Sequence, residues 1–204
     1  MFKLIVAIFL STLLSALSIS VMAEGNPEQG KSISQACAVC HGADGNSPVG
    51  SFPSIAGQQP RYLLKQLKDM KSGDRSAPLM TGQLDAFSEE DLSDLAAYFA
   101  GQTRKGGAAK PELVALGETI YRAGIKRKNI AACSACHLPQ GEGNNPAGFP
   151  ALAGQWPEYT EAQLKAFRVG DRHNDGDGRM MRSTAMDLSD TEITAVASYL
   201  YGLH

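Results

Sequence analysis

One small-domain pattern is written twice in this chain of 204 residues, and this repeat is the strongest constraint on its fold. The pentapeptide CAVCH at 37–41 returns as CSACH at 133–137, and the segment FPSIAGQ at 52–58 returns as FPALAGQ at 149–155. Self-similarity of this kind indicates repeated copies of one structural unit. We therefore expect two related small domains rather than one large core.

The stretch between the two copies has the composition of a linker. Residues 101–110, GQTRKGGAAK, are small, basic and rich in glycine, and such segments rarely hold regular structure. We expect the first domain at 24–102, the linker at 103–111 and the second domain at 112–204. Domains of this size bury only modest cores, so a large apolar cofactor would help each of them to fold.

The two pentapeptides contain all four cysteines of the chain. C-x-x-C-H is the attachment sequence of a c-type haem, in which two thiols bond to the porphyrin and the adjacent imidazole ligates the iron. On a helix, residues three and four apart share a face, so both sulfurs and the imidazole reach one macrocycle. The sequence therefore predicts two covalent haems, attached at Cys37 and Cys40 with His41, and at Cys133 and Cys136 with His137.

Other uses of four cysteines explain this pattern less well. Exported chains often form disulfides, and a thioredoxin-like redox pair needs a βαβ setting that is missing here. A zinc site rarely places its two C-x-x-C halves 96 residues apart. None of these alternatives requires a histidine after each pair.

Both copies show the same helical outline, without sustained alternation of polar and apolar residues. In each we expect a helix leading into the haem motif, a loop rich in glycine and proline, an amphipathic helix, a methionine-bearing loop and a final helix. The first helices are expected to start near Pro27 and Pro111, the amphipathic helices to cover 61–70 and 158–169, and the final helices to have Ser88 and Ser189 as N-caps. The predicted fold is all-α, a tandem repeat of two small helical domains, each around a haem.

Alignment of the two copies also selects a second axial ligand for each iron. Met80 lies eight residues before Ser88, and Met181 lies eight residues before Ser189, with Met180 as the competitor in the second copy. A methionine sulfur favours Fe(II) and raises the reduction potential of the iron. A six-coordinate iron leaves no position for peroxide or oxygen, so this ligand set predicts a one-electron carrier rather than an enzyme.

Residues 1–23 have the pattern of a secretory signal peptide that is cleaved after Ala23, with an uncleaved membrane anchor as the alternative. Export to the periplasm agrees with haem attachment, which in bacteria takes place outside the cytoplasm. The mature chain would carry 18 basic and 21 acidic residues, a balance unlike that of a nucleic-acid binder. Residues 25–32 match the Walker A pattern, but no strand precedes them, and we expect no nucleotide binding.

The two copies differ by polar insertions. The second copy has nine more residues before its haem motif, and they include Lys126-Arg127-Lys128, which we interpret as a solvated loop, with docking to an acidic partner or anionic lipid as the alternative. Four more residues fall near 174–178, which we interpret as a turn rather than a calcium loop. The two domains carry net charges of −4 and −2 and the linker +3, so we expect different redox partners at the two ends.

These motifs resemble the cytochrome c4 family, di-haem proteins of the bacterial periplasm with two class I cytochrome c domains. The similarity covers the mature chain and includes both haem motifs, both Phe-Pro segments, RYLLKQL at 61–67, MTG at 80–82 and NDGD at 174–177. The resemblance implies that His41 and Met80 hold one iron and His137 and Met181 the other. It also implies that the carbonyls of Pro53 and Pro150 accept hydrogen bonds from the ligand imidazoles.

The resemblance further implies a role in respiration. Members of the family carry electrons from a quinol-oxidising complex of the cytochrome bc1 type towards a terminal oxidase, often while loosely attached to the inner membrane. Two alternatives stay open at this point. One is a di-haem electron-transfer subunit of a dehydrogenase, such as flavocytochrome c sulfide dehydrogenase. The other is a di-haem peroxidase, which would need one iron without methionine.

Overall fold

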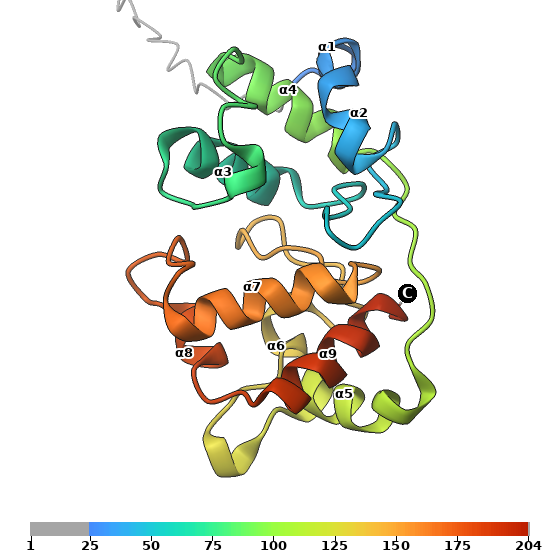
Figure 1. Cartoon of the computed structure of the whole chain (residues 1–204), viewed down its shortest axis with the longest axis vertical. Helices are drawn as coiled ribbons and strands as arrows, with labels where there is room; N and C mark the ends of the chain where they lie inside the picture. The colour runs from blue at the N-terminus through green and yellow to red at the C-terminus, as the bar shows by residue number, and fades with distance from the viewer. Residues whose placement is uncertain (1–24, 204) are drawn as a thin grey trace, which may run out of the picture.

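The computed structural model describes residues 25–203, which form two helical units stacked along the long axis of the molecule (Figure 1). The predicted signal peptide with its cleavage after Ala23 and the terminal His204 lie outside the described residues. Among residues 25–203 there is no strand, and β-pairing is limited to isolated bridges between Ile125 and Ile130 and between Asn144 and Phe149. The all-α prediction is confirmed.

The two units share the order of their main helices, but the second has an additional 3₁₀ turn, η2, and has the helix α8 where the first has the 3₁₀ turn η1. The first contains α1 (Pro27–Ile33), α2 (Gln35–His41), α3 (Pro60–Ser72), the 3₁₀ turn η1 (Pro78–Met80) and α4 (Glu89–Ala100). The second contains α5 (Pro111–Ala123), η2 (Lys126–Lys128), α6 (Ser134–His137), α7 (Pro157–Val169), α8 (Met180–Ala185) and α9 (Asp190–Tyr201). In the described part of the chain, no helix combines the length and apolar character needed to cross a bilayer.

The final helix of each unit begins with the predicted serine cap. The Ser88 hydroxyl accepts a hydrogen bond from the Asp91 amide, and the Asp91 carboxylate accepts one from the Ser88 amide. Ser189 and Glu192 make the same reciprocal pair at the start of α9. Such capping boxes satisfy amides that have no partner within the helix, so these two helices start where the sequence predicts.

The first and last helices of each unit cross at a glycine. A Cβ atom at Gly30 in α1 would lie 2.0 Å from the carbonyl oxygen of Asp94 in α4, and one at Gly117 in α5 would lie 2.3 Å from that of Ala195 in α9. Because glycine has no side chain, the two backbones of each pair can approach this closely. Apolar side chains of the crossing helices then form the centre of each core, with Leu95 and Phe99 in the first unit and Ile120, Val196 and Leu200 in the second.

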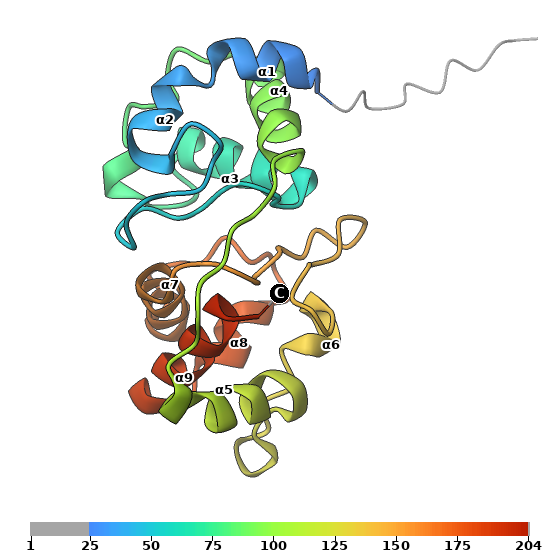
Figure 2. The same cartoon turned by 90° about the vertical axis from the view of Figure 1, so that its right-hand side faces the viewer.

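An extended segment joins the units along one side of the molecule (Figure 2). Within it, Arg104 donates from Nε to the carbonyl oxygen of Ala56 at 2.9 Å and from Nη1 to that of Ala153 at 3.0 Å. These two alanines are equivalent positions of the repeat, so one side chain of the linker binds both units. Lys105 forms an ion pair with Asp44. The basic charge of the linker is therefore largely engaged with the protein itself.

The basic cluster 126–128 is packed more closely than the sequence suggests. Lys128 Nζ lies 2.6 Å from Glu192 Oε2, and Arg127 Nη2 lies 3.2 Å from Glu192 Oε1. The Lys128 side chain is only 22% exposed. The interpretation of a free solvated loop is therefore wrong for Lys128, because the insertion folds back onto the N-terminus of α9.

Candidate functional site

Both C-x-x-C-H motifs lie on helical backbone that presents their side chains together. Cys37, Cys40 and His41 occupy the last two turns of α2, and Cys133 immediately precedes α6, which ends at His137. The four cysteines are half-buried and none is joined to another by a disulfide, so the disulfide alternative is not formed. Burial raises the pKa of the Cys133 thiol to about 11, whereas a thioredoxin-like pair depends on a lowered thiol pKa.

The two histidines are buried and held in the same way. His41 Nδ1 lies 2.8 Å from the carbonyl oxygen of Pro53, and His137 Nδ1 lies 2.8 Å from that of Pro150. Since a carbonyl oxygen can only accept, Nδ1 carries the proton and Nε2 keeps its lone pair for a metal. This confirms the two proline contacts that the family resemblance implies. Burial lowers the pKa of both imidazoles, against the effect of the proline carbonyls, which favours the neutral form that ligates iron.

The two aligned methionines occupy equivalent places in different local structure. Met80 is the last residue of η1, as expected for a loop, whereas Met181 lies in the first turn of the short helix α8. The Met181 side chain packs on the cluster around Phe167 and Leu188, while Met180 is 47% exposed. Of the two neighbouring methionines, Met181 is the one directed towards the interior of its unit.

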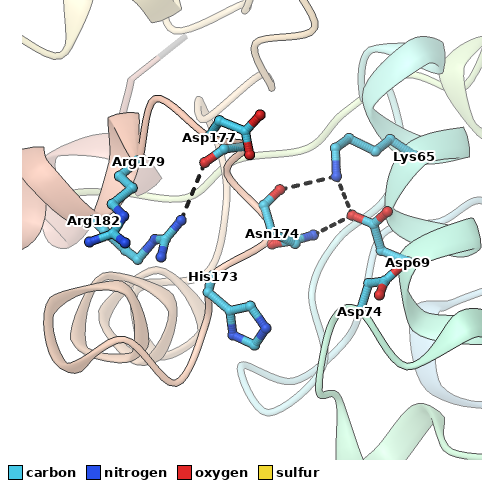
Figure 3. A pocket seen from close by; sticks show the side chains of 9 residues that line it. Lys65, Asp69, Asp74, His173, Asn174, Asp177, Arg179 and Arg182 are labelled. Atoms are coloured by element: carbon cyan, nitrogen blue, oxygen red, sulfur yellow. Dashed lines mark hydrogen bonds and ion pairs between the residues drawn. The ribbon is translucent and has the colours of Figure 1, made fainter.

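Asp175 holds the backbone next to Met181. Its carboxylate accepts hydrogen bonds from the Arg182 amide at 2.9 Å and from Arg182 Nε at 2.7 Å. The predicted turn is present around Gly176, and it contributes to a polar cavity of about 470 Å³ between α3 and the second methionine segment (Figure 3). In this cavity Lys65 and Asn174 both contact the carboxylate of Asp69. Among the described residues, no group of three or more His, Cys, Asp or Glu side chains is placed to hold a metal ion there or elsewhere.

Two buried arginines at the boundary between the units were not found by sequence reasoning. Arg75 of the first unit donates to the Tyr159 hydroxyl of the second at 2.9 Å, and Arg172 of the second donates to the Tyr62 hydroxyl of the first at 2.9 Å. Each arginine lies 13 residues after the tyrosine of its own copy, a repeated offset that could have revealed the pair. Gln66 and Gln163 supply further amide oxygens to both guanidinium groups.

These arginines lack negative partners. Arg75 and Arg172 are 8% and 7% exposed, and neither forms an ion pair with a carboxylate of the described residues. Arg75 Nε is buried without any hydrogen-bond partner among those residues. A buried charge without a counterion is costly. An anion bound at the boundary between the units would therefore stabilise the two guanidinium groups. A haem carries two carboxylates, which the arginines could bind. The cysteine pairs and the oriented imidazoles also fit this cofactor.

Comparison with known proteins agrees with this chemistry. The cytochrome c family model matches residues 27–102 and 114–204, once in each unit. Cytochrome c4 from Azotobacter vinelandii is 48% identical over 96% of this chain and 98% of its own length, and cytochrome c4 from Pseudomonas aeruginosa is 47% identical over 99% of both chains. The crystal structure of reduced cytochrome c4 from Pseudomonas stutzeri superimposes with a TM-score of 0.87 at 47% identity, covering 88% of this chain and 100% of that one. The chain belongs to the cytochrome c4 family.

Membership of the cytochrome c4 family establishes the chemistry of the two units. The protein carries two covalent c-type haems, attached at the cysteine pairs Cys37/Cys40 and Cys133/Cys136. Each haem, when bound, takes up and releases one electron at its iron. The chain is an electron-transfer protein rather than an enzyme.

Proposed function

We propose that His41 and Met80 ligate one iron and that His137 and Met181 ligate the other. The observation that carries this proposal is the repeated geometry of the imidazoles, each buried and oriented by a proline carbonyl at Nδ1, which leaves Nε2 as the nitrogen that would ligate iron. Met80 and Met181 occupy the same position in the two copies of the repeat, and Met181 is turned inwards whereas Met180 is exposed. This supports methionine as the second ligand of each iron. Saturated irons of this kind transfer single electrons with little rearrangement.

The two carboxylates of each haem would pair with cationic side chains at the boundary between the units. We assign Arg75 and Arg172 to this task because they are buried, cationic and paired only with neutral oxygens. Loss of a cation near an iron favours Fe(III). Arg75→Met is therefore expected to lower at least one reduction potential, and unchanged potentials would contradict this assignment.

The physiological role we propose is that of a respiratory carrier in the periplasm. Electrons would pass from a quinol-oxidising complex of the bc1 type to a terminal oxidase, and the carrier would attach loosely to the surface of the inner membrane. The signal-peptide pattern at 1–23 and the similarity to cytochromes c4 support this role. The domain limits proposed from the sequence, 24–102 and 112–204, assign one haem to each end of the carrier.

A second candidate role is supported by other relatives. A thiosulfate dehydrogenase electron acceptor from Stutzerimonas stutzeri is 40% identical over 80% of this chain and 77% of its own length. The structure of thiosulfate dehydrogenase TsdBA from Marichromatium purpuratum superimposes with a TM-score of 0.77 at 30% identity, although only 40% of that chain is covered. Acceptance of electrons from a dehydrogenase is therefore the alternative to the respiratory role.

A potentiometric titration of the holoprotein tests the ligands. Met80→Ala and Met181→Ala should each abolish half of the sulfur-to-iron absorption band at the red end of the visible spectrum and lower one of two reduction potentials. Met180→Ala is the matched control and should leave both unchanged. Loss of the band in Met180→Ala, with Met181→Ala unaffected, would transfer the ligand role to Met180.

Rapid-mixing kinetics test the role. Reduction of the carrier by a bc1-type complex and by a thiosulfate dehydrogenase are compared at equal concentrations. Fast reduction by the first, followed by oxidation by membranes that contain the terminal oxidase, is expected. Reduction by the dehydrogenase alone would favour the second candidate, and peroxide turnover by the purified protein would contradict both.

A further inference from the structure

Two glutamines make matching hydrogen bonds across the boundary between the units. Gln155 Oε1 accepts from the Ser54 amide at 3.0 Å, and Gln155 Nε2 donates to the Ser54 carbonyl at 2.8 Å. In the opposite direction, Gln58 Oε1 accepts from the Ala151 amide at 2.7 Å, and Gln58 Nε2 donates to the Ala151 carbonyl at 2.9 Å. All four residues are at most 7% exposed. Because the glutamines end the two copies of one heptapeptide, the exchange is nearly symmetric.

The same peptide groups also hold the histidines. The peptide between Pro53 and Ser54 accepts a hydrogen bond from His41 through its carbonyl and donates one to Gln155 through its amide. The peptide between Pro150 and Ala151 connects His137 with Gln58 in the same way. Each imidazole is therefore joined to a side chain of the other unit through a single peptide group.

A peptide that donates through its amide becomes a better acceptor at its carbonyl, because the two bonds polarise the same amide dipole. A stronger bond at Nδ1 places more electron density on the imidazole, and groups that contact a ligand in this way tune the metal that it holds. Greater density on the ligand stabilises Fe(III) and lowers the reduction potential. For each histidine, the glutamine that polarises its peptide acceptor belongs to the opposite unit.

We propose that Gln155 and Gln58 are positioning residues that set the reduction potential of the haem in the opposite unit. Gln155 acts on the iron of the first unit through Ser54, and Gln58 acts on the iron of the second through Ala151. This inference rests on the proposed ligation by His41 and His137. It makes the boundary between the units part of the redox machinery as well as a packing surface.

The test is a spectroelectrochemical titration of Gln155→Leu and Gln58→Leu holoproteins. Gln155→Leu should raise the potential of the first-unit haem, with about a two- to tenfold increase in the Fe(II)/Fe(III) ratio at a fixed solution potential, and should leave the second-unit couple within error. Gln58→Leu should show the reverse. A Met80→His variant identifies which of the two measured potentials belongs to the first-unit haem, because a second imidazole ligand lowers that potential.

Gln59→Leu is the matched control. Gln59 also crosses the boundary, with Nε2 donating to the Glu142 carbonyl at 2.5 Å, but it contacts neither histidine-bearing peptide. It should leave both couples unchanged. Gln155→Glu keeps an oxygen that accepts from the Ser54 amide, so it should not raise the first-unit potential even if Gln155→Leu loosens the boundary.

The Nδ1–H proton resonance of His41 in the reduced protein gives an independent readout. It should move upfield in Gln155→Leu and stay in place in Gln59→Leu. Equal shifts of both couples in all three leucine variants, or no shift in Gln155→Leu, would overturn the cross-boundary effect. If the unmodified protein shows no low-spin spectrum, the proposed ligands are wrong. Failure of the ligand assignment can therefore be distinguished from failure of the cross-boundary effect.

Discussion

Gly30 of α1 lies directly against the backbone of Asp94 in α4, so closely that a Cβ atom at Gly30 would stand 2.0 Å from the Asp94 carbonyl oxygen. We predict that Gly30→Ala destabilises the first unit by about 3 kcal/mol or more, because backbone cannot move aside as a flexible side chain does. Gly117→Ala should do the same to the second unit. Urea unfolding of the holoproteins measures both effects.

Gly178→Ala is the control for this pair. A Cβ atom at Gly178 meets nothing within 4 Å, so its stability should stay within about 0.5 kcal/mol of the parent protein. If Gly30→Ala unfolds at the same urea concentration as Gly178→Ala, the close helix crossing is not a constraint on the fold.

The tyrosine hydroxyls at the boundary support a second prediction. Tyr159→Phe removes one of two acceptors for Arg75 Nη2, and Tyr62→Phe removes one of two acceptors for Arg172 Nη2. Each leaves a buried guanidinium N–H with one partner fewer, so each should lower the free energy of unfolding by about 1–3 kcal/mol. Tyr98→Phe, which loses only a 3.4 Å contact to Ala43 within one unit, should cost less.

Contacts of this kind could not be predicted from the sequence, although their residues could be aligned. Alignment of the repeat pairs Met80 with Met181, and it likewise pairs Tyr62 with Tyr159. It did not show that Arg75 reaches Tyr159, which is 84 residues away, because an alignment identifies equivalent residues and not touching ones. The serine caps were predicted well, since a cap depends on residues close in the chain. The proline carbonyls were expected from the family resemblance and not from local sequence.

Contacts that the sequence does not reveal also explain which predictions were wrong. Lys128 was expected in solvent because a run of basic residues usually lies there, yet Glu192 lies 64 residues further on and binds it. Similarly, the segment of Met181 forms a helix instead of a loop. The four-residue insertion brings in Asp175, and its carboxylate fixes the Arg182 amide at the start of α8.

The pairing of Glu192 with Lys128 predicts a dependence of stability on pH. Burial alone would raise the pKa of the Glu192 carboxyl, but hydrogen bonds from Lys128 and Ser189 outweigh it and hold that pKa below its ordinary value of 4.5. A carboxyl whose pKa is lowered by folding stabilises the protein above the unfolded-state pKa. That contribution is lost as the pH falls through the folded-state pKa.

Glu192→Gln should therefore be less stable than the parent protein at pH 7, by about 1.5–3 kcal/mol, and the difference should shrink as the pH falls below about 4. Urea unfolding at several pH values measures this. Asp91→Asn changes the equivalent cap of the first unit, which forms no ion pair with a lysine of residues 25–203, and its difference should be smaller. A constant difference between Glu192→Gln and the parent at all pH values would contradict the ion-pair explanation.

The contacts of Asp175 lead to a prediction about the second iron, which rests on the proposed ligation by Met181. Its carboxylate binds the amide and Nε of Arg182, the residue that follows the ligand. Asp175→Ala frees this backbone, so Met181 should dissociate from the iron more readily. On warming, half of the sulfur-to-iron band should disappear at a lower temperature than in the parent protein. The first-unit half should melt as before.

Asp177→Ala provides the comparison, because Asp177 is an exposed residue of the same turn. It should leave the melting of both halves of the band unchanged. Since Asp175 acts through the backbone and not through charge at the iron, Asp175→Asn, which retains one acceptor oxygen, should lie between the two alanine variants. If Asp175→Ala and Asp177→Ala behave alike, the turn does not secure Met181, and packing on Phe167 and Leu188 must hold the ligand in place.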